Sequence, residues 1–410
     1  MVIRSGVSVV VILMLWCPRF ARAEEITLDQ ATAIAYESNP DLAAAAAELT
    51  VAAGAIQQSN YFSQFNPAID NDADYRKRKG ESNSQDWRIH LSQELEIFGQ
   101  RGLRKESARL GYQRSAEELN DQRRLLAAAV QMSFYEALRL RQQVTLLGEL
   151  EALDGRLTKM AVERFDAGEI GQIELNLAEV RYGQSKLAVL DVREAYRLER
   201  SSLGRLLGGT VGAQPEPSGA LRPDLTHADV AVLVANARAN RPDLKAAQLE
   251  IARLETEATL NKRLALPNPS IGVFFGHEQN TERFVGGTVG LSIPIFNRRQ
   301  AEDTAIAGRL AQARAKLRAT ELDIEREVRD AYGRYIEAVK ALRISSDEMV
   351  APAQQSFGLL EEAFKAGKMD LLTLSVAERQ AFEARSSYLE AWFNCAAARV
   401  SLELAVGGSV

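Results

Sequence analysis

The chain contains two stretches that are nearly the same, Arg164–Gly171 (RFDAGEIG) and Ala363–Asp370 (AFKAGKMD). Each is followed by a similar run, IELNLAE at Ile173–Glu179 and LTLSVAE at Leu372–Glu378. A glycine among polar residues, set between two long segments that favour helix, is typical of a tight turn between two helices. The sequence therefore predicts two helical hairpins whose tips lie at about 165–171 and 364–370.

The segments beside these turns are longer than the helices of a globular domain. Proline is absent from Arg101–Phe165, and four glycines are its only interruptions. At about 1.5 Å per residue, such a helix would reach roughly 95 Å. Apolar residues are spread evenly along the chain, and alanine is abundant in every helical stretch, so we expect no separate compact core.

The hairpins belong to a longer internal duplication. Pro-Asp-Leu at position 40 returns at 242, Asn-Pro at 66 returns at 268, and Gly-Gly at 208 returns at 407. Anchors that keep one order with nearly constant spacing indicate a repeat. We expect a first repeat at 24–209 and a second at 227–410, joined by a linker at 210–226 that is rich in glycine and proline.

Each repeat also contains a region that alternates with period two. Apolar and polar side chains alternate over Trp87–Ile97, with Gln93 as the one exception, and alternation recurs over Val285–Ile295. Weaker partner strands precede them at Pro67–Tyr75 and Pro269–Gly276. The strand regions are thus expected at about 65–98 and 268–296, and their length suits tilted membrane strands.

Period-two alternation also fits a hairpin half-buried on a soluble core. The membrane reading is favoured by an export signal and by the lack of another place to bury these apolar faces. Four strands cannot close a membrane barrel, and open sheet edges are not tolerated in lipid. Several chains must therefore contribute to one barrel.

Residues 1–23 have the pattern of a secretory signal peptide. Arg4 precedes an apolar run over Val7–Trp16, which is too short to span a bilayer, and Ala21-Arg22-Ala23 forms a cleavage site. A lipoprotein signal ending at Cys17 is disfavoured because the bulky Trp16 precedes it. After cleavage Cys395 is the only cysteine, so no disulfide within the chain is expected.

The charge pattern argues against nucleic acid as a partner. The net charge is −5 at pH 7, and no extended basic face accumulates. The basic run Arg76–Lys79 lies at a predicted hairpin turn. It is either a solvated loop or a contact for anionic headgroups of membrane lipid.

Taken in order, these features resemble the TolC family of outer membrane factors. The resemblance covers Ile26 to Gly408 and rests on the repeated Pro-Asp-Leu, on the strand endings LSQEL at Leu91–Leu95 and LSIPIF at Leu291–Phe296, and on the turns. It implies a mainly α fold with a small transmembrane β part, in duplicated helix–β-hairpin–helix–turn–helix halves. As a homotrimer, these halves would form a 12-stranded β-barrel continued by a 12-helix periplasmic α-barrel.

The resemblance implies an efflux duct in the outer membrane of a Gram-negative bacterium. Its partners would be outer membrane lipid, a periplasmic adaptor (membrane fusion) protein and an inner-membrane pump of the RND type. EIFGQR at Glu96–Arg101 and IPIFNRRQ at Ile293–Gln300 look most like the CzcC-type branch that serves heavy-metal cations. Drug efflux or type I secretion is an alternative, and a periplasmic helical scaffold or interaction protein is an alternative of another class.

No motif for catalysis or cofactor binding is found. The histidines, His90, His227 and His277, form no helix-spaced ligand pair. No nucleophile motif and no phosphate-binding loop occurs in the sequence. We therefore expect a protein that is not an enzyme and that holds neither a cofactor nor a metal site.

The resemblance assigns roles to the two tips. Adaptor docking is expected at Ala167, Gly168, Glu169, Ala366, Gly367 and Lys368. Candidate gate residues are Glu174, which matches a tip aspartate of the family, and Thr373, which replaces a lumen-facing aspartate. Asp370 lies nearby and could substitute for it. Alternatively, Glu169, Glu174 and Asp370 only favour a helix N-terminus through the helix dipole.

Overall fold

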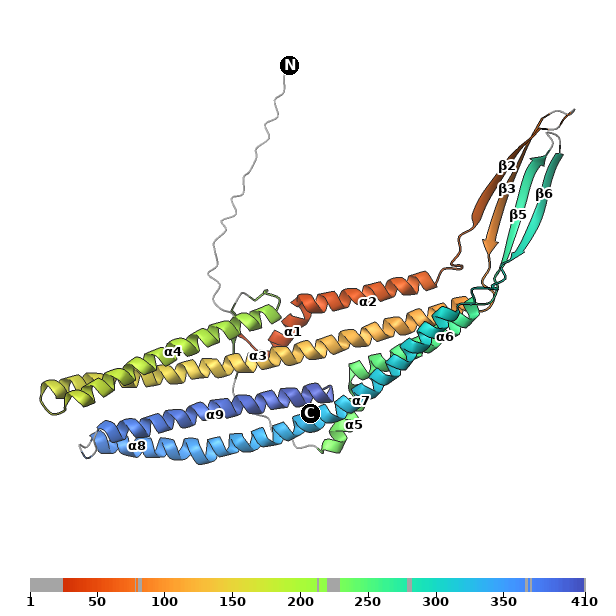
Figure 1. Ribbon diagram of the computed structural model, residues 1–410. Coiled ribbons are helices and arrows are strands. Elements are labelled where there is room, and N and C mark those ends of the chain that lie inside the picture. Colours follow the sequence, from red (N-terminus) through yellow and green to blue (C-terminus); the bar gives the residue numbers. More distant parts are fainter. Residues whose placement is uncertain are drawn as a thin grey trace, which may run out of the picture.

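The protein is elongated, with its helices side by side, a sheet at one end and the two helical tips at the other (Figure 1). This computed structural model describes residues 25–77, 79, 83–211, 214–219, 229–278, 282–365, 368 and 371–408. The predicted signal peptide at 1–23 lies outside the described residues, as do 212–213 and 220–226 of the predicted linker.

The order of elements repeats. The first half contains β1 (Glu25–Ile26), α1 (Leu28–Ser38), α2 (Pro40–Ser59), β2 (Ala68–Arg76), β3 (Ser84–Glu94), α3 (Gln100–Asp166) and α4 (Gln172–Leu206). After β4 (Glu216–Pro217), the second half contains α5 (Val230–Asn240), α6 (Pro242–Leu264), β5 (Pro269–Glu278), β6 (Glu282–Leu291), α7 (Gln300–Arg343), η1 (Ile344–Val350), α8 (Ala351–Lys365) and α9 (Leu371–Val406). We call α3 with α4 the first hairpin, and α7, η1 and α8 with α9 the second hairpin.

The two long descending helices differ in one place. α3 is continuous over 67 residues, whereas its counterpart becomes a π-helix for seven residues at η1. Pro352 lies just after η1, at a position that Leu153 occupies in the first repeat. Proline has no amide hydrogen and its ring displaces the carbonyl four residues earlier, which explains the wider turn there. The descending helix is therefore distorted in the second repeat, whereas that of the first repeat is continuous.

The four longer strands form one sheet in the order β2-β3-β5-β6, with every neighbouring pair antiparallel. β3 and β5 join the two repeats, from Trp87 opposite His277 to Glu94 opposite Ser270. β3 and β6 end at Glu94 and Leu291, earlier than the alternation indicated. Gln93, the exception in the pattern, donates through Nε2 to the carbonyl of Phe65 at 2.9 Å and so ties the strand base to the preceding loop.

The two faces of this sheet have opposite chemistry. The register places on one face Ile69, Trp87, Ile89, Leu91, Ile271, Val273, Phe275, Val285, Val289 and Leu291. Val285 and Val289 are each 82% exposed in the single chain, so this apolar face is uncovered. The opposite face carries acidic side chains of β2 and also Arg88, whose guanidinium lies 5.7 and 5.3 Å from the ring centres of Phe274 and Phe284.

The expectation of no separate compact core was wrong, because each repeat has its own cluster of buried apolar side chains. Phe134 and Leu203 lie in the core around α1, and Ile324 and Trp392 lie in the core around α5. The ring of Tyr135 on α3 meets Trp392 on α9 edge-on at 5.7 Å. The two repeats are therefore joined both here and in the sheet.

The repeated Pro-Asp-Leu motifs tie the start of each repeat to its end. Asn39 accepts hydrogen bonds from the first amides of α2, and its Nδ2 donates to the carbonyl of Leu206 at 3.0 Å. At the equivalent position Arg241 donates through Nη1 to the carbonyl of Ala405 at 3.3 Å. Different side chains thus make the same connection in both repeats.

Part of the predicted linker is fixed to the first repeat. β4 pairs in parallel with β1, and Ser218 donates its amide to the carbonyl of Ile26 at 2.8 Å. Arg141 donates to the carbonyl of Pro217 at 2.7 Å. Among the helices described, none combines the length and apolar character needed to cross a bilayer.

Candidate functional site

The first tip is a compact turn that ends α3. Gly168 has φ +76°, a conformation that glycine adopts without the strain a side chain would cause. Its amide donates to the carbonyl of Phe165 at 2.9 Å, and the amide of Glu169 donates to Arg164 at 2.8 Å. This pair of bonds is a Schellman motif, which satisfies the last carbonyls of the helix. Ala167, Gly168 and Glu169 are all exposed at this end of the molecule.

The second tip repeats the bond that spans five positions in the first. The amide of Lys368 donates to the carbonyl of Ala363 at 3.0 Å, the counterpart of the bond from Glu169 to Arg164. Lys368 is exposed and places a positive charge where the first tip has the negative charge of Glu169. Of the predicted docking and gate residues, Ala366, Gly367 and Asp370 lie outside the described residues.

Glu174 caps the helix that it begins. Its Oε2 accepts a hydrogen bond from the amide of Gly171 at 2.6 Å, so it satisfies a donor at the N-terminus of α4. Arg164, also near the first turn, contacts the carboxylate of Glu169 at 4.0 Å. Within one chain, Glu174 therefore stabilises the N-terminus of α4, which agrees with the alternative in which it only favours a helix N-terminus. Thr373 is exposed near the start of α9.

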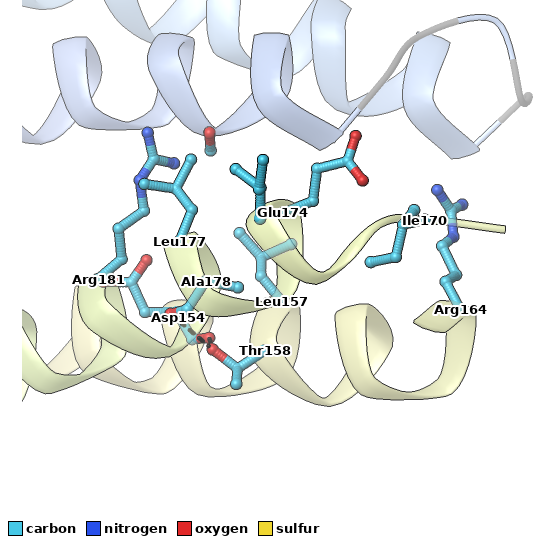
Figure 2. A pocket seen from close by; sticks show the side chains of 11 residues that line it. Asp154, Leu157, Thr158, Arg164, Ile170, Glu174, Leu177, Ala178 and Arg181 are labelled. Carbon is cyan, nitrogen blue, oxygen red and sulfur yellow. Dashed lines mark hydrogen bonds between the residues drawn. The ribbon is translucent and has the colours of Figure 1, made fainter. Parts of the chain in front are cut away.

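A cavity of about 320 Å³ lies behind the first tip, against the start of α9. Figure 2 shows Arg164 and Ile170 at the turn end of the lining and Asp154 farther along, between α3 and α4. Arg181 extends from α4 toward α9. Ser375 of α9 contributes to the lining. The structure thus brings the predicted gate residue Glu174 to a seam between the first hairpin and α9.

Two carboxyl groups in this region were missed by sequence reasoning. Asp154 on α3 lines the cavity behind the tip and also a second one of about 270 Å³, where Glu378 of α9 is 2% exposed. A signal for Glu378 was present in the sequence. It falls at helical spacing among Leu374, Ala377 and Ala381, which form the buried side of α9.

The described residues hold no group of three or more metal-ligating side chains close enough to share an ion. His90 lies on the sheet, with Nε2 3.7 Å from Asp72, and His277 lies on a neighbouring strand. His227 falls outside the described residues. The arrangement at the tips offers exposed turns and a charged seam, which suit contact with other proteins.

A sequence profile described as outer membrane efflux protein matches the chain twice, over residues 32–209 and 233–408. The chain belongs to this family. As an outer membrane efflux protein it is a channel of the TolC type, located in the outer membrane with a large periplasmic helical part, and it is not an enzyme.

Individual relatives of this efflux protein point to different cargoes. It is 25% identical over 375 residues to the cobalt-zinc-cadmium resistance protein CzcC of Cupriavidus metallidurans, covering 91% of this chain and 87% of that one. It is 26% identical over 426 residues to the pyoverdine export outer membrane protein OpmQ of Pseudomonas putida, covering 96% and 87%. The outer-membrane channel OprN has the same fold, with a TM-score of 0.77 at 18% identity over 93% of this chain and 90% of that one.

Proposed function

We propose that this efflux channel works as a homotrimer that releases heavy-metal cations across the outer membrane. In this proposal an inner-membrane pump of the RND type supplies the cations through a periplasmic adaptor. The observation that carries the substrate assignment is the similarity to a cobalt-zinc-cadmium resistance protein along 91% of the chain.

The polar face of the sheet supports a cationic cargo. Asp70, Asp72 and Asp74 lie at alternate positions of β2 and therefore share this face. Asp86 and Glu278 lie on it too, and both contact Arg76, at 2.9 and 3.1 Å. On this face carboxylates outnumber guanidinium groups. If it lines the duct, its field attracts cations and repels anions.

The edges of the sheet support assembly from several copies. β2 and β6 each pair on one side only within the described chain. Unpaired backbone groups cost several kcal/mol each in hydrocarbon, so a sheet that enters the bilayer must close. Pairing of β2 with β6 of the next copy would close it, and three copies would give twelve strands.

The tips are proposed as the contact for the adaptor, through Ala167, Gly168 and Glu169 in the first turn and Ala366, Gly367 and Lys368 in the second. Among the described tip residues, Ala167, Gly168, Glu169 and Lys368 support this by their exposure at the end opposite the sheet. Glu169 and Lys368 also carry opposite charges. Glu174 and Thr373 are proposed as gate residues because they lie in the first turns of the ascending helices α4 and α9, where the tips of three chains would converge. Asp370, which precedes α9 in the sequence, is proposed with them.

A second candidate cargo is a siderophore. The match to a pyoverdine exporter is equally strong in identity and slightly longer, at 96% of the chain. Drug efflux and type I secretion use the same class of duct, so the proposed contact between the tips and the adaptor would be the same for them.

The test compares cargoes in the native bacterium. The gene is deleted, and the strain is complemented with the wild-type chain or with an empty vector. Growth is then measured on graded zinc, cobalt and cadmium, and siderophore is measured in the culture medium. We expect the deletion to lower tolerance to at least one of these metals and complementation to restore it. Unchanged metal tolerance together with loss of secreted siderophore would replace the metal assignment with the second candidate.

A further inference from the structure

Glu378 is a carboxyl group buried without a full set of partners. It lies on α9 between the buried residues Leu374 and Ala381 and is 2% exposed. Its Oε1 has no hydrogen-bond partner among the described residues. An ionised carboxylate in such a place is very unfavourable, and the group normally responds by taking up a proton.

The groups around Glu378 come from both hairpins. Asp154 and Arg156 act on it from α3, and Arg181 acts on it from α4. Arg379 and Glu383 of α9 line the same cavity of about 270 Å³, and its described lining includes no residue of α8. The remaining lining combines the apolar residues Leu146, Leu147, Leu150, Ala188 and Phe382 with the polar residues Gln184, Ser185, Ser375 and Ser386. The two carboxyls therefore share a partly dry seam between the first hairpin and α9.

The surroundings favour the neutral form of Glu378. Burial raises the pKa of Glu378 to about 8, and the nearby negative charge of Asp154 adds to this, against the opposing effects of Arg156 and Arg181. Burial also raises the pKa of Asp154, opposed by a hydrogen bond with Ser185 and by the charges of Arg181 and Arg379. At neutral pH the packed seam is therefore compatible with a proton on Glu378.

We propose that Glu378 is a proton-dependent latch between the two hairpins: its neutral carboxyl allows α9 to stay packed on α3 and α4, and its ionisation separates them. When the seam opens, water reaches the carboxyl and its pKa returns toward the ordinary value of about 4.3. Between that value and about 8, the closed seam binds a proton that the open seam does not. The ratio of closed to open seam then falls by up to about tenfold per pH unit in each chain.

The latch can be followed by the distance between the two hairpins. Spin labels are placed at Ala152→Cys on α3 and Gln380→Cys on α9, two exposed positions on either side of the seam. The native Cys395 is 1% exposed, so it stays unlabelled. Labelled chains are mixed with an excess of unlabelled chains during assembly, and pulsed electron paramagnetic resonance is recorded from about pH 5.5 to 9. A longer distance should appear as the pH rises.

Three variants identify the group responsible. Glu378→Gln keeps the size but cannot ionise, so the short distance should persist at every pH. Asp154→Asn removes the like charge, so the seam should stay closed to a higher pH than in the wild type. Glu383→Gln, an exposed glutamate at the same cavity, should behave as the wild type. A wild-type distance that does not change with pH, or a Glu378→Gln protein that opens like the wild type, would refute the latch.

The outcome does not depend on the cargo, since the measurement uses the assembled protein without substrate. If Glu378→Gln fails to assemble, the Asp154→Asn shift still decides the matter. A transition at the same pH as the wild type would then count against the carboxyl pair.

Discussion

Among single residues, Gly208 is a position where both the backbone conformation and the close packing require glycine. It has φ +68° just after α4, and a side-chain carbon added there would lie 2.1 Å from the carbonyl oxygen of Ser38. We expect Gly208→Ala to cost about 1 to 2 kcal/mol from the left-handed backbone alone, and more because the backbone of Ser38 must move. The measurement is the melting temperature of the helical circular dichroism signal in detergent.

The neighbouring Gly209 provides a matched control. It has φ +73°, yet nothing lies within 4 Å of the position of an added side-chain carbon. Gly209→Ala should therefore show the backbone strain without the collision, and its melting temperature should fall less. Equal losses in the two variants would mean that the contact with Ser38 contributes nothing to stability.

Residue roles were the hardest feature to predict from the sequence. The repeated Pro-Asp-Leu motif was recognised as a marker of duplication, but the bonds from Asn39 to Leu206 and from Arg241 to Ala405 join residues more than 160 positions apart. The raised pKa of Glu378 likewise depends on burial in the seam and on the charge of Asp154, which lies on another helix. Periodicity along one helix shows which side is buried and not which partner covers it.

At the scale of elements, the sheet faces lead to a paired prediction. Val289 is 82% exposed on the apolar face, and Thr288 points to the polar face. If the apolar face meets lipid, Val289→Arg should cost roughly 2 to 4 kcal/mol near mid-strand, whereas Thr288→Arg should be much milder. The yield of assembled protein in the outer membrane, seen as a heat-sensitive oligomer band, measures the difference. Equal assembly of the two variants would overturn the proposed lipid face.

The two tips are tested together because they are equivalent in the repeats. Gly168→Leu forces a side chain into a left-handed position, and Gly367→Leu places the same bulk at the corresponding sequence position of the second repeat. The double variant should abolish efflux while leaving the channel in the outer membrane. Site-specific cross-linking to the adaptor should disappear at the same time. Export lost with normal cross-linking would show that the tips act in something other than docking.

Elements were predictable to the extent that local sequence determines them. The turn at Gly168 follows from its own residues, because the Schellman motif uses bonds within six positions. The ends of β3 and β6 did not follow, since they depend on where β5 begins across the sheet. The π-helix at η1 was also not predicted, although Pro352 follows its last residue by two positions in the sequence.

At the scale of the whole molecule, the duplication sets what one chain contributes to the proposed trimer. Both repeats contribute two strands to a single sheet and one hairpin to the helical part (Figure 1). The repeat order could be read from the sequence, and the family match follows it at 32–209 and 233–408. The seam between the hairpins could not be read from the sequence, because it depends on how α9 packs on α3.

The proposed gate is tested first at Glu174, where charge and helix capping must be separated. Glu174→Gln keeps an oxygen that can accept from the amide of Gly171, whereas Glu174→Ala removes both the cap and the charge. If the charge holds neighbouring chains together, its loss is sufficient, so both the glutamine and the alanine variants should raise single-channel conductance in a planar bilayer. An exposed ion pair is worth at most about 1 kcal/mol, so the closed-to-open ratio should change by up to about fivefold. A rise seen only with alanine would assign Glu174 to capping.

The last prediction concerns Thr373, a proposed gate residue at the position where the resemblance to the TolC family implies a lumen-facing aspartate. Thr373 is exposed near the start of α9, and a carboxylate near a helix N-terminus is favourable, so Thr373→Asp should fold normally. In a trimer the substitution adds three carboxylates around one axis, where their fields combine and attract cations. Reversal potentials in a salt gradient should shift toward greater cation preference, and added divalent ions should block the current more strongly. Thr373→Asn, which changes shape similarly without charge, should leave both unchanged. If the aspartate variant also leaves selectivity and block unchanged, position 373 lies away from the narrow part of the duct, and the gate must be sought deeper along the seam.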